Sequence, residues 1–187
     1  MRARLASGNP HKLAELRLAL PEWEIELAGT TSFPPEDGIT YAENARLKAE
    51  HGRLFSPDDA WVLGEDSGIE VAGLGGRPGL QSARWAEDGV ARLLAELAGV
   101  ADRRARYICT IVALGPTSEL VVEGILEGRI AFVRSGAEGF GYDPIFIPES
   151  EQQTVAELGD SWKSANSHRA RAAGALATLL HSRAPGC

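Results

Sequence analysis

The chain has 187 residues, 44% hydrophobic and 24% charged, which is the composition of an ordinary globular protein with a full core. Its 26 acidic residues outnumber its 19 lysines and arginines, and the net charge of −7 argues against a binder of nucleic acid or of an anionic membrane surface. The two cysteines form no disulfide framework, and no apolar stretch reaches the roughly 20 residues that span a bilayer. We therefore expect a cytoplasmic protein with a single domain over residues 1–182 and a short C-terminal tail over 183–187.

The first half of the chain predicts alternating strands and helices. After a short N-terminal strand, Asn9 is the expected N-cap of a helix and Pro10 its first residue, and leucines then recur at the helical period. A second helix is expected over residues 41–55, with alanines along one face. A buried strand at 61–63 is expected to lead into the acidic run Glu65-Asp66, followed by a glycine-rich connection over 68–79.

The second half predicts a hairpin between helices. Two apolar runs that are joined by a Gly-Pro-Thr-Ser turn indicate antiparallel strands. The expected segments are a helix at 90–97, strands at 107–114 and 120–126, a third strand at 129–133 that extends the hairpin, an apolar run at 145–147 and a C-terminal helix at 165–181. Because helices and strands are interleaved, we expect an α/β fold with a mixed sheet.

A candidate anion site lies where the first strand meets the first helix. A loop that leads directly into a helix presents backbone N–H groups and the positive end of the helix dipole to a phosphate. Its residues are Ser7, Gly8, Asn9, Pro10, His11 and Lys12, and the lysine adds a full positive charge. The alternative is an ordinary turn with a solvent-facing lysine. The segment is not a Walker A loop, because the GxxxxGK[ST] spacing is absent.

A candidate metal site follows the buried strand, where Glu65, Asp66 and Ser67 stand together. Carboxylates at the end of a strand suit Mg²⁺, which takes one or two of them together with phosphate oxygens and water. Asp66 is the natural centre, and Glu36 is our candidate for the second ligand, with Glu43 and Glu65 as alternatives. The alternative is that these residues form an acidic turn without a metal.

Two further groups offer contacts to a flat, polar ligand. One combines aromatic rings with a carboxylate on a glycine loop, and the other gathers cationic and neutral donors near the start of the last helix. Core aromatic residues beside a turn, and a solvated polar helix start, explain these groups nearly as well. Their members are Phe140, Gly141, Tyr142 and Asp143 in the first group, and Lys163, His168 and Arg169 in the second.

Taken in order, these motifs resemble the inosine triphosphatase family of non-canonical purine nucleoside triphosphate pyrophosphatases. The matching segments are SGNPHK, ITYAENARLKA, EDSGIEVAGLGGRPGLQSARW, FGYDPIF, TVAEL and SHR, and they extend over nearly the whole chain. The resemblance implies an elongated α/β protein with two lobes around a nucleotide cleft, which usually forms homodimers. It implies Mg²⁺-dependent hydrolysis of inosine, deoxyinosine and xanthosine triphosphates to the monophosphate and pyrophosphate.

Residue roles follow from the resemblance, motif by motif. Asp66 is the expected proton acceptor and metal ligand, and Ser67 is expected to touch the substrate. The loop from Ser7 to Lys12 is expected to bind the triphosphate. The expected nucleoside contacts are Phe140, Gly141, Tyr142, Asp143, Lys163, His168 and Arg169.

The sequence leaves two alternatives open. A related Maf-type enzyme has a similar fold, but the FGYD and SHR motifs count against it. A module that senses nucleotides without turnover needs the phosphate loop but not Asp66, so pyrophosphate release with Mg²⁺ separates it from an enzyme.

Overall fold

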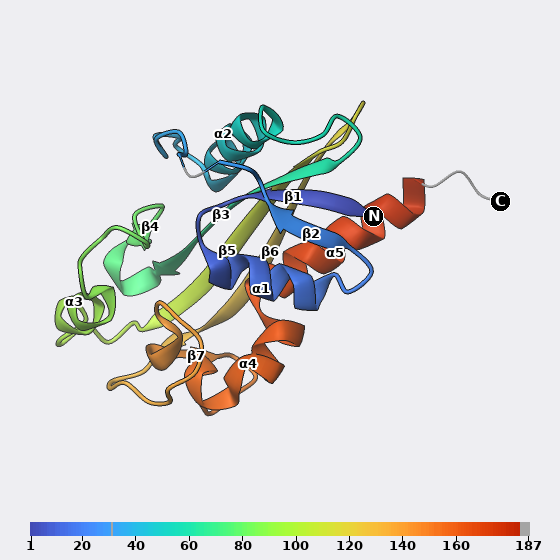
Figure 1. Cartoon of the computed structure of the whole chain (residues 1–187). Helices are drawn as coiled ribbons and strands as arrows, with labels where there is room; N and C mark the ends of the chain where they lie inside the picture. Colours follow the sequence, from blue (N-terminus) through green and yellow to red (C-terminus); the bar gives the residue numbers. More distant parts are fainter. Residues whose placement is uncertain (31, 184–187) are drawn as a thin grey trace. The chain divides into compact units, whose positions relative to one another are not determined.

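The computed structural model describes residues 1–30 and 32–183. Figure 1 shows the elements in chain order. They are β1 Arg2–Ala6, α1 Pro10–Ala19, β2 Glu24–Leu27, α2 Tyr41–Arg53, β3 Trp61–Val71, η1 Ala72–Leu74, β4 Pro78–Gly79, α3 Gly89–Glu96, β5 Arg104–Leu114, β6 Glu119–Ile130, η2 Asp143–Ile145, β7 Phe146–Pro148, α4 Val155–Asn166 and α5 His168–Arg183.

In the described chain the strands form one seven-stranded sheet in the order β2-β1-β3-β5-β6-β7, with β4 paired to β3. β1 is parallel to both β2 and β3, whereas β7 is antiparallel to β6. β5 and β6 are neighbours joined by residues 115–118, a connection too short for a parallel crossover, so these two strands are antiparallel. The predicted α/β fold with a mixed sheet and the predicted hairpin are both confirmed.

The chain divides into two compact units. The first comprises residues 1–66, 109–124 and 169–187, and the second comprises residues 67–108 and 125–168. Strands β3, β5 and β6 each contribute residues to both units. The two units are therefore built from interleaved segments of the chain.

The first unit packs helices against both faces of its strands (Figure 1). Leucines of α1 and small residues of α5 join one apolar cluster with Leu5 and Leu63, while Ala45 and Ala49 of α2 pack against Val112 in another cluster. Asn9 caps α1, since its side chain accepts a hydrogen bond from the His11 N–H group. This N-cap confirms the predicted start of the first helix.

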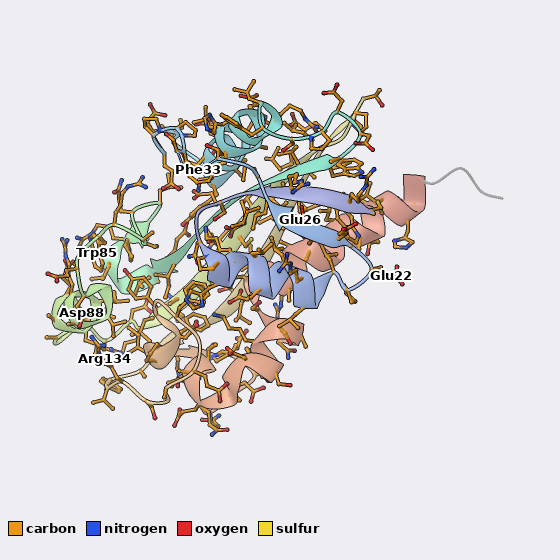
Figure 2. All side chains as sticks on the ribbon, in the orientation of Figure 1. Glu22, Glu26, Phe33, Trp85, Asp88 and Arg134 are labelled. Atoms are coloured by element: carbon orange, nitrogen blue, oxygen red, sulfur yellow. The ribbon has the colours of Figure 1, made fainter. Side chains whose placement is uncertain are left out.

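In the second unit, α3 packs on strand residues through Val90 and Leu93. The short segment after Trp85 is well tied, because Asp88 caps α3 and also pairs with Arg134, while the Arg92 guanidinium lies 4.4 Å from the centre of the Trp85 ring. Figure 2 labels Trp85, Asp88 and Arg134 on this unit. None of the described helices is long and apolar enough to cross a membrane.

Three predicted elements were wrong. The strand at 61–63 does not end at the acidic residues but continues to Val71, so Glu65 and Asp66 lie within β3. The expected third strand at 129–133 is absent, because β6 ends at Ile130. The C-terminal segment holds two helices, α4 and α5, which are separated at Ser167, and the first of them was not predicted.

The physical reason for the longer β3 is that its polar residues are paired with other side chains and its glycine is required by packing. A Cβ atom on Gly64 would lie 1.9 Å from the Ala45 carbonyl oxygen, so glycine here allows α2 to approach the strand closely and does not signal a turn. As for the predicted tail, Arg183 is the last residue of α5, and residues 184–187 lie outside the described chain.

Candidate active site

The loop between β1 and α1 is internally bonded. The Asn9 N–H group donates to Ser7 Oγ over 3.1 Å, and the His11 N–H group donates to Asn9 Oδ1 over 2.9 Å. A Cβ atom on Gly8 would lie 3.4 Å from the Phe33 ring, so this aromatic side chain stands beside the loop. The loop has the strand-to-helix geometry that was predicted, and two of its amide groups are already engaged.

Lys12 reaches from α1 into a buried cluster of charges. Its ammonium group lies 2.5 Å from Glu65 Oε2, and the Glu65 side chain is fully buried. Arg169, at the start of α5, donates to Glu65 Oε1 over 3.0 Å and also pairs with Glu15 of α1. The Cys109 thiol donates to the same Glu65 oxygen over 3.2 Å.

The protonation states of this cluster follow from its charges. Burial alone would raise the pKa of Glu65, but Arg169 and Lys12 outweigh burial and hold that pKa well below its usual range. Burial and the neighbouring Glu65 carboxylate raise the pKa of the Cys109 thiol well above normal, so the thiol remains a hydrogen-bond donor. With two carboxylates and two cations, the cluster of Lys12, Arg169, Glu65 and Glu15 has no net charge.

Asp66 belongs to a second cluster on the opposite face of β3. Successive side chains of a strand point to opposite faces, and Asp66 meets α2 where Glu65 meets α1 and α5. Lys48 Nζ donates to Asp66 Oδ1 over 2.8 Å, and Asn44 Nδ2 donates to Asp66 Oδ2 over 3.1 Å. Lys48 also pairs with Glu36 and donates to the Glu65 carbonyl oxygen over 3.1 Å.

The protonation of Asp66 is set by burial and by two neighbouring charges. Its pKa is raised, first by burial, while Lys48 opposes this effect and the Glu36 carboxylate adds to it. The pKa of Lys48 is also raised, because Asp66 and Glu36 together outweigh burial. A buried carboxylate with a raised pKa accepts a proton more readily than an exposed one.

The donor set around Asp66 suits a hard divalent cation. The Asp66 and Glu36 carboxylates converge on one ammonium group, that of Lys48, so the site already draws one cation between two anions. Within residues 1–30 and 32–183, no three His, Cys, Asp or Glu side chains are grouped closely enough to hold a metal by themselves. Two carboxylates are the set that Mg²⁺ takes when substrate oxygens and water supply its other ligands.

The second unit gathers most of the predicted nucleoside contacts around Asp143. Lys163 Nζ lies 2.6 Å from Asp143 Oδ2, and the Phe140 N–H group donates to the same oxygen over 2.8 Å. The Lys163 ammonium group lies 3.9 Å from the centre of the half-buried Phe140 ring, a cation–π contact. Tyr142 is buried, its hydroxyl donates to the Ser82 carbonyl oxygen over 3.0 Å, and burial raises its pKa to about 12.

Tyr107 links His168 to this group. Its ring stacks on the His168 ring with centroids 4.6 Å apart and planes at 7°, and its hydroxyl lies 3.3 Å from Asp143 Oδ1. The structure thus brings together Phe140, Asp143, Lys163 and, through Tyr107, His168. Arg169, the next residue in the chain, belongs to the Glu65 cluster of the first unit and is fully buried there.

Sequence reasoning missed four polar residues that support these groups. They are Glu15, Asn44, Lys48 and Tyr107. The sequence carried a signal for two of them, since Asn44 and Lys48 each directly precede an alanine of the apolar face of α2, at Ala45 and Ala49. A polar residue beside a buried helical stripe either faces solvent or has a buried partner, and sequence alone does not decide between the two.

A sequence model of the Ham1 family matches residues 3–179. The chain belongs to this family. Among the curated relatives of this Ham1 chain, the dITP/XTP pyrophosphatase of Bdellovibrio bacteriovorus is 43% identical, with 97% of this chain and 98% of that protein covered. The dITP/XTP pyrophosphatase of Gloeobacter violaceus is 45% identical over 90% of this chain and 88% of that protein.

Solved Ham1 structures have the same fold. The Ham1 protein of Staphylococcus aureus superposes with a TM-score of 0.84 at 34% identity, covering 97% of this chain and 99% of that one. A HAM1 protein from Coxiella burnetii gives the same TM-score, identity and coverage. The family resemblance drawn from the motifs and the α/β fold are therefore confirmed.

Proposed function

We propose that this chain hydrolyses the non-canonical purine nucleoside triphosphates dITP, ITP and XTP to the monophosphate and pyrophosphate, and so cleanses the nucleotide pool. The observation that carries the proposal is Asp66, a buried carboxylate with a raised pKa that shares one cation with Glu36. The names of the relatives that match nearly the whole chain support the same activity. A module that only senses nucleotides would not need such a carboxylate.

Mg²⁺ is the proposed cofactor, and Asp66 and Glu36 are its proposed protein ligands. When bound, Mg²⁺ supplies positive charge against the phosphate oxygens and lowers the barrier to attack by water. Lys48 already lies between these two carboxylates, so the site holds one positive charge before any metal enters. The requirement of the reaction for Mg²⁺ is the part of the proposal that an assay tests most directly.

We assign proton transfer and binding of the triphosphate to residues of the first unit. Asp66 accepts the proton of the attacking water. The loop from Ser7 to Lys12 holds the triphosphate, and Lys12 exchanges its bond to Glu65 for one to a phosphate oxygen. Since Glu65 keeps its bonds to Arg169 and Cys109, that exchange does not leave the buried carboxylate without partners.

We assign recognition of the base to residues of the second unit. Phe140 offers a half-buried ring for stacking, while Lys163 and His168 supply polar groups for the 6-oxo oxygen that hypoxanthine and xanthine share. Arg169 is assigned a supporting role through its bonds to Glu15 and Glu65, in place of the direct contact that the motif suggested. A site built around a 6-oxo acceptor rejects adenine strongly, because the 6-amino group leaves a buried donor unpaired. Guanine has the same 6-oxo oxygen, so its rejection requires that no partner in the site serves its 2-amino group.

The deciding experiment measures pyrophosphate release from a panel of triphosphates, with and without Mg²⁺, by the wild type and by Asp66→Asn. We expect dITP, ITP and XTP to be preferred over ATP and GTP. In the variant we expect turnover to fall by about 10²- to 10⁴-fold, the usual contribution of a general base. Its melting temperature is measured alongside, because the Asp66–Lys48 pair is buried and its loss lowers stability. In H₂¹⁸O, attack at the α-phosphorus places the label in the monophosphate.

The possible outcomes are distinct. Label in pyrophosphate would move the attack to the β-phosphorus, and equal rates on ITP and ATP would refute the base selectivity. An Asp66→Asn variant with normal turnover would refute the role of Asp66. Binding of dITP, detected as a raised melting temperature without any hydrolysis, would favour a nucleotide sensor over an enzyme.

A homodimer is the proposed assembly. Phe132 and Val133 leave 80% and 70% of their surface exposed, and exposed apolar side chains of this kind often mark protein contacts. Light scattering during size-exclusion chromatography should give twice the 19.9 kDa chain mass. A mass of one chain at micromolar concentration would refute the dimer.

A further inference from the structure

Asn44 is a completely buried amide on α2 that bonds in two directions. Its Nδ2 atom donates to Asp66 Oδ2 over 3.1 Å, and its Oδ1 atom accepts from the Gly38 N–H group over 2.9 Å. A buried amide without partners would be costly, so a side chain in this place needs both bonds. The same residue therefore connects the carboxylate of β3 to the segment that precedes α2.

The orientation of the amide is determined by its partners. The Gly38 backbone N–H group can only donate, so the Asn44 oxygen must face it, and the Asn44 nitrogen is left to face Asp66. Lys48, one helical turn along α2, donates to the other Asp66 oxygen over 2.8 Å. Each oxygen of the Asp66 carboxylate thus takes one donor from α2, and the plane of the carboxylate is held.

The Gly38 side of this bridge carries Glu36, two residues earlier in the chain. A Cβ atom on Gly38 would lie 2.7 Å from Asn44 Oδ1 and 2.8 Å from Glu43 Cβ, so only glycine allows this approach. The next residue is tied down as well, since the Ile39 N–H group donates to Glu43 Oε2 over 2.8 Å. The segment that carries Glu36 is therefore held against the start of α2.

We propose that Asn44 is a positioning residue that holds the Glu36 segment and the Asp66 carboxylate at a fixed spacing, so that both carboxylates meet one divalent cation. That a divalent cation binds at this site rests on the proposed function, whereas the hydrogen bonds of Asn44 do not depend on it. Asn44 acts through Asp66 and Gly38 and need not touch the substrate or the metal. Side chains that orient metal ligands in this way typically change metal affinity or activity by about 10- to 100-fold when they are removed.

The test uses Mn²⁺ as a probe, whose binding is read by electron paramagnetic resonance without any substrate. Asn44→Ala removes both bonds, and Gly38→Ala disturbs the bridge from its other end without substituting any residue of α2. The matched control is Thr40→Ala, which removes the N-cap of the same helix and leaves Asn44 and Asp66 unchanged. All three melting temperatures are measured, so that loss of fold is separated from loss of metal.

We expect both bridge variants to weaken Mn²⁺ binding by about 10-fold or more. The Mg²⁺ concentration for half-maximal pyrophosphate release should rise in parallel, with kcat reduced and the KM for dITP little changed. Thr40→Ala should lower the melting temperature and leave Mn²⁺ binding as in the wild type. A role in helix stability alone would instead affect Asn44→Ala and Thr40→Ala alike.

Equal Mn²⁺ binding by the wild type and Asn44→Ala, including no binding by either protein, overturns the proposal. So does an equal loss of Mn²⁺ binding in Thr40→Ala. A wild type that releases no pyrophosphate from any triphosphate would refute the proposed function, while the comparison of Mn²⁺ binding would still decide the role of Asn44.

Discussion

Replacing Glu65 with glutamine tests whether the buried charge cluster stabilises the first unit. Glu65 is fully buried and bonds to Lys12 over 2.5 Å, to Arg169 over 3.0 Å and to Cys109 over 3.2 Å. The amide keeps the shape of the side chain but removes the negative charge that two cations share. Because Arg169 is itself buried, it would remain in the core with only Glu15 as its counter-ion.

The expected cost is large. Removing one partner of a buried ion pair typically lowers the free energy of unfolding by about 3–5 kcal/mol, since the other charge stays buried without compensation. The matched control is Glu119→Gln, which removes the same charge from the half-exposed pair with Arg46. Pairs of this exposed kind contribute about 0–1 kcal/mol. Urea denaturation followed by circular dichroism at pH 7 gives both values.

The pH dependence has a definite sign. Burial would raise the pKa of Glu65, but Arg169 and Lys12 hold it well below the value of about 4.3 of an unfolded glutamate. The unfolded state therefore takes up a proton first as the pH falls. The advantage of the wild type over Glu65→Gln should be complete at pH 7 and should decrease below about pH 4.3.

Two results would refute this reasoning. A Glu65→Gln variant as stable as Glu119→Gln at pH 7 would mean that the desolvation of the cluster cancels its attraction. A stability difference that stays constant down to pH 3 would mean that the glutamate charge is not its source.

Three smaller changes test other parts of the fold. Gly64→Ala places a Cβ atom 1.9 Å from the Ala45 carbonyl oxygen and should cost about 3 kcal/mol or more in urea denaturation; a normal midpoint would show that α2 can move away. Thr154→Ala breaks the capping box with Glu157 and should cost about 1 kcal/mol, whereas an unchanged melting temperature would count against the cap. Burial raises the pKa of Tyr142 to about 12, so the phenol of the unfolded chain ionises first, near pH 10. The stability of the wild type should therefore decrease from about pH 10 to 12. An equally steep decrease in Tyr142→Phe would contradict this.

The sequence predicted the fold best where local signals agreed. The N-cap at Asn9 and the proline that follows it located the start of α1. The turn over residues 115–118 identified the hairpin, which is closed by a bond of 2.8 Å from the Gly115 N–H group to the Ser118 carbonyl oxygen. In these segments the residues that determine the conformation are neighbours in the chain, so a single sequence contains the information.

Predictions failed where a distant residue decided the local structure. The pattern predicts that the strand ends before Glu65, Asp66, Ser67 and Gly68. The strand instead continues through them, because Lys12, Lys48 and Arg169 neutralise the two carboxylates. Lys12 and Lys48 are 36 residues apart, and Arg169 lies near the end of the chain. The local pattern around Glu65 and Asp66 therefore does not show that these three cations approach the two carboxylates. The motifs indicated candidate site residues, but not which of them are paired.

The two adjacent carboxylates show why this pairing matters for function. Glu65 faces two cations and is kept ionised, with a pKa well below normal, so it is a poor proton acceptor. Asp66 shares a single ammonium group with Glu36, and its pKa is raised, so the proposed base is the carboxylate that remains short of positive charge. The two carboxylates have different surroundings because side chains alternate along β3. Glu65 faces α1 and α5, and Asp66 faces α2. A one-residue shift of the strand would exchange the two environments, and Glu65 would then occupy the position proposed for metal binding and catalysis.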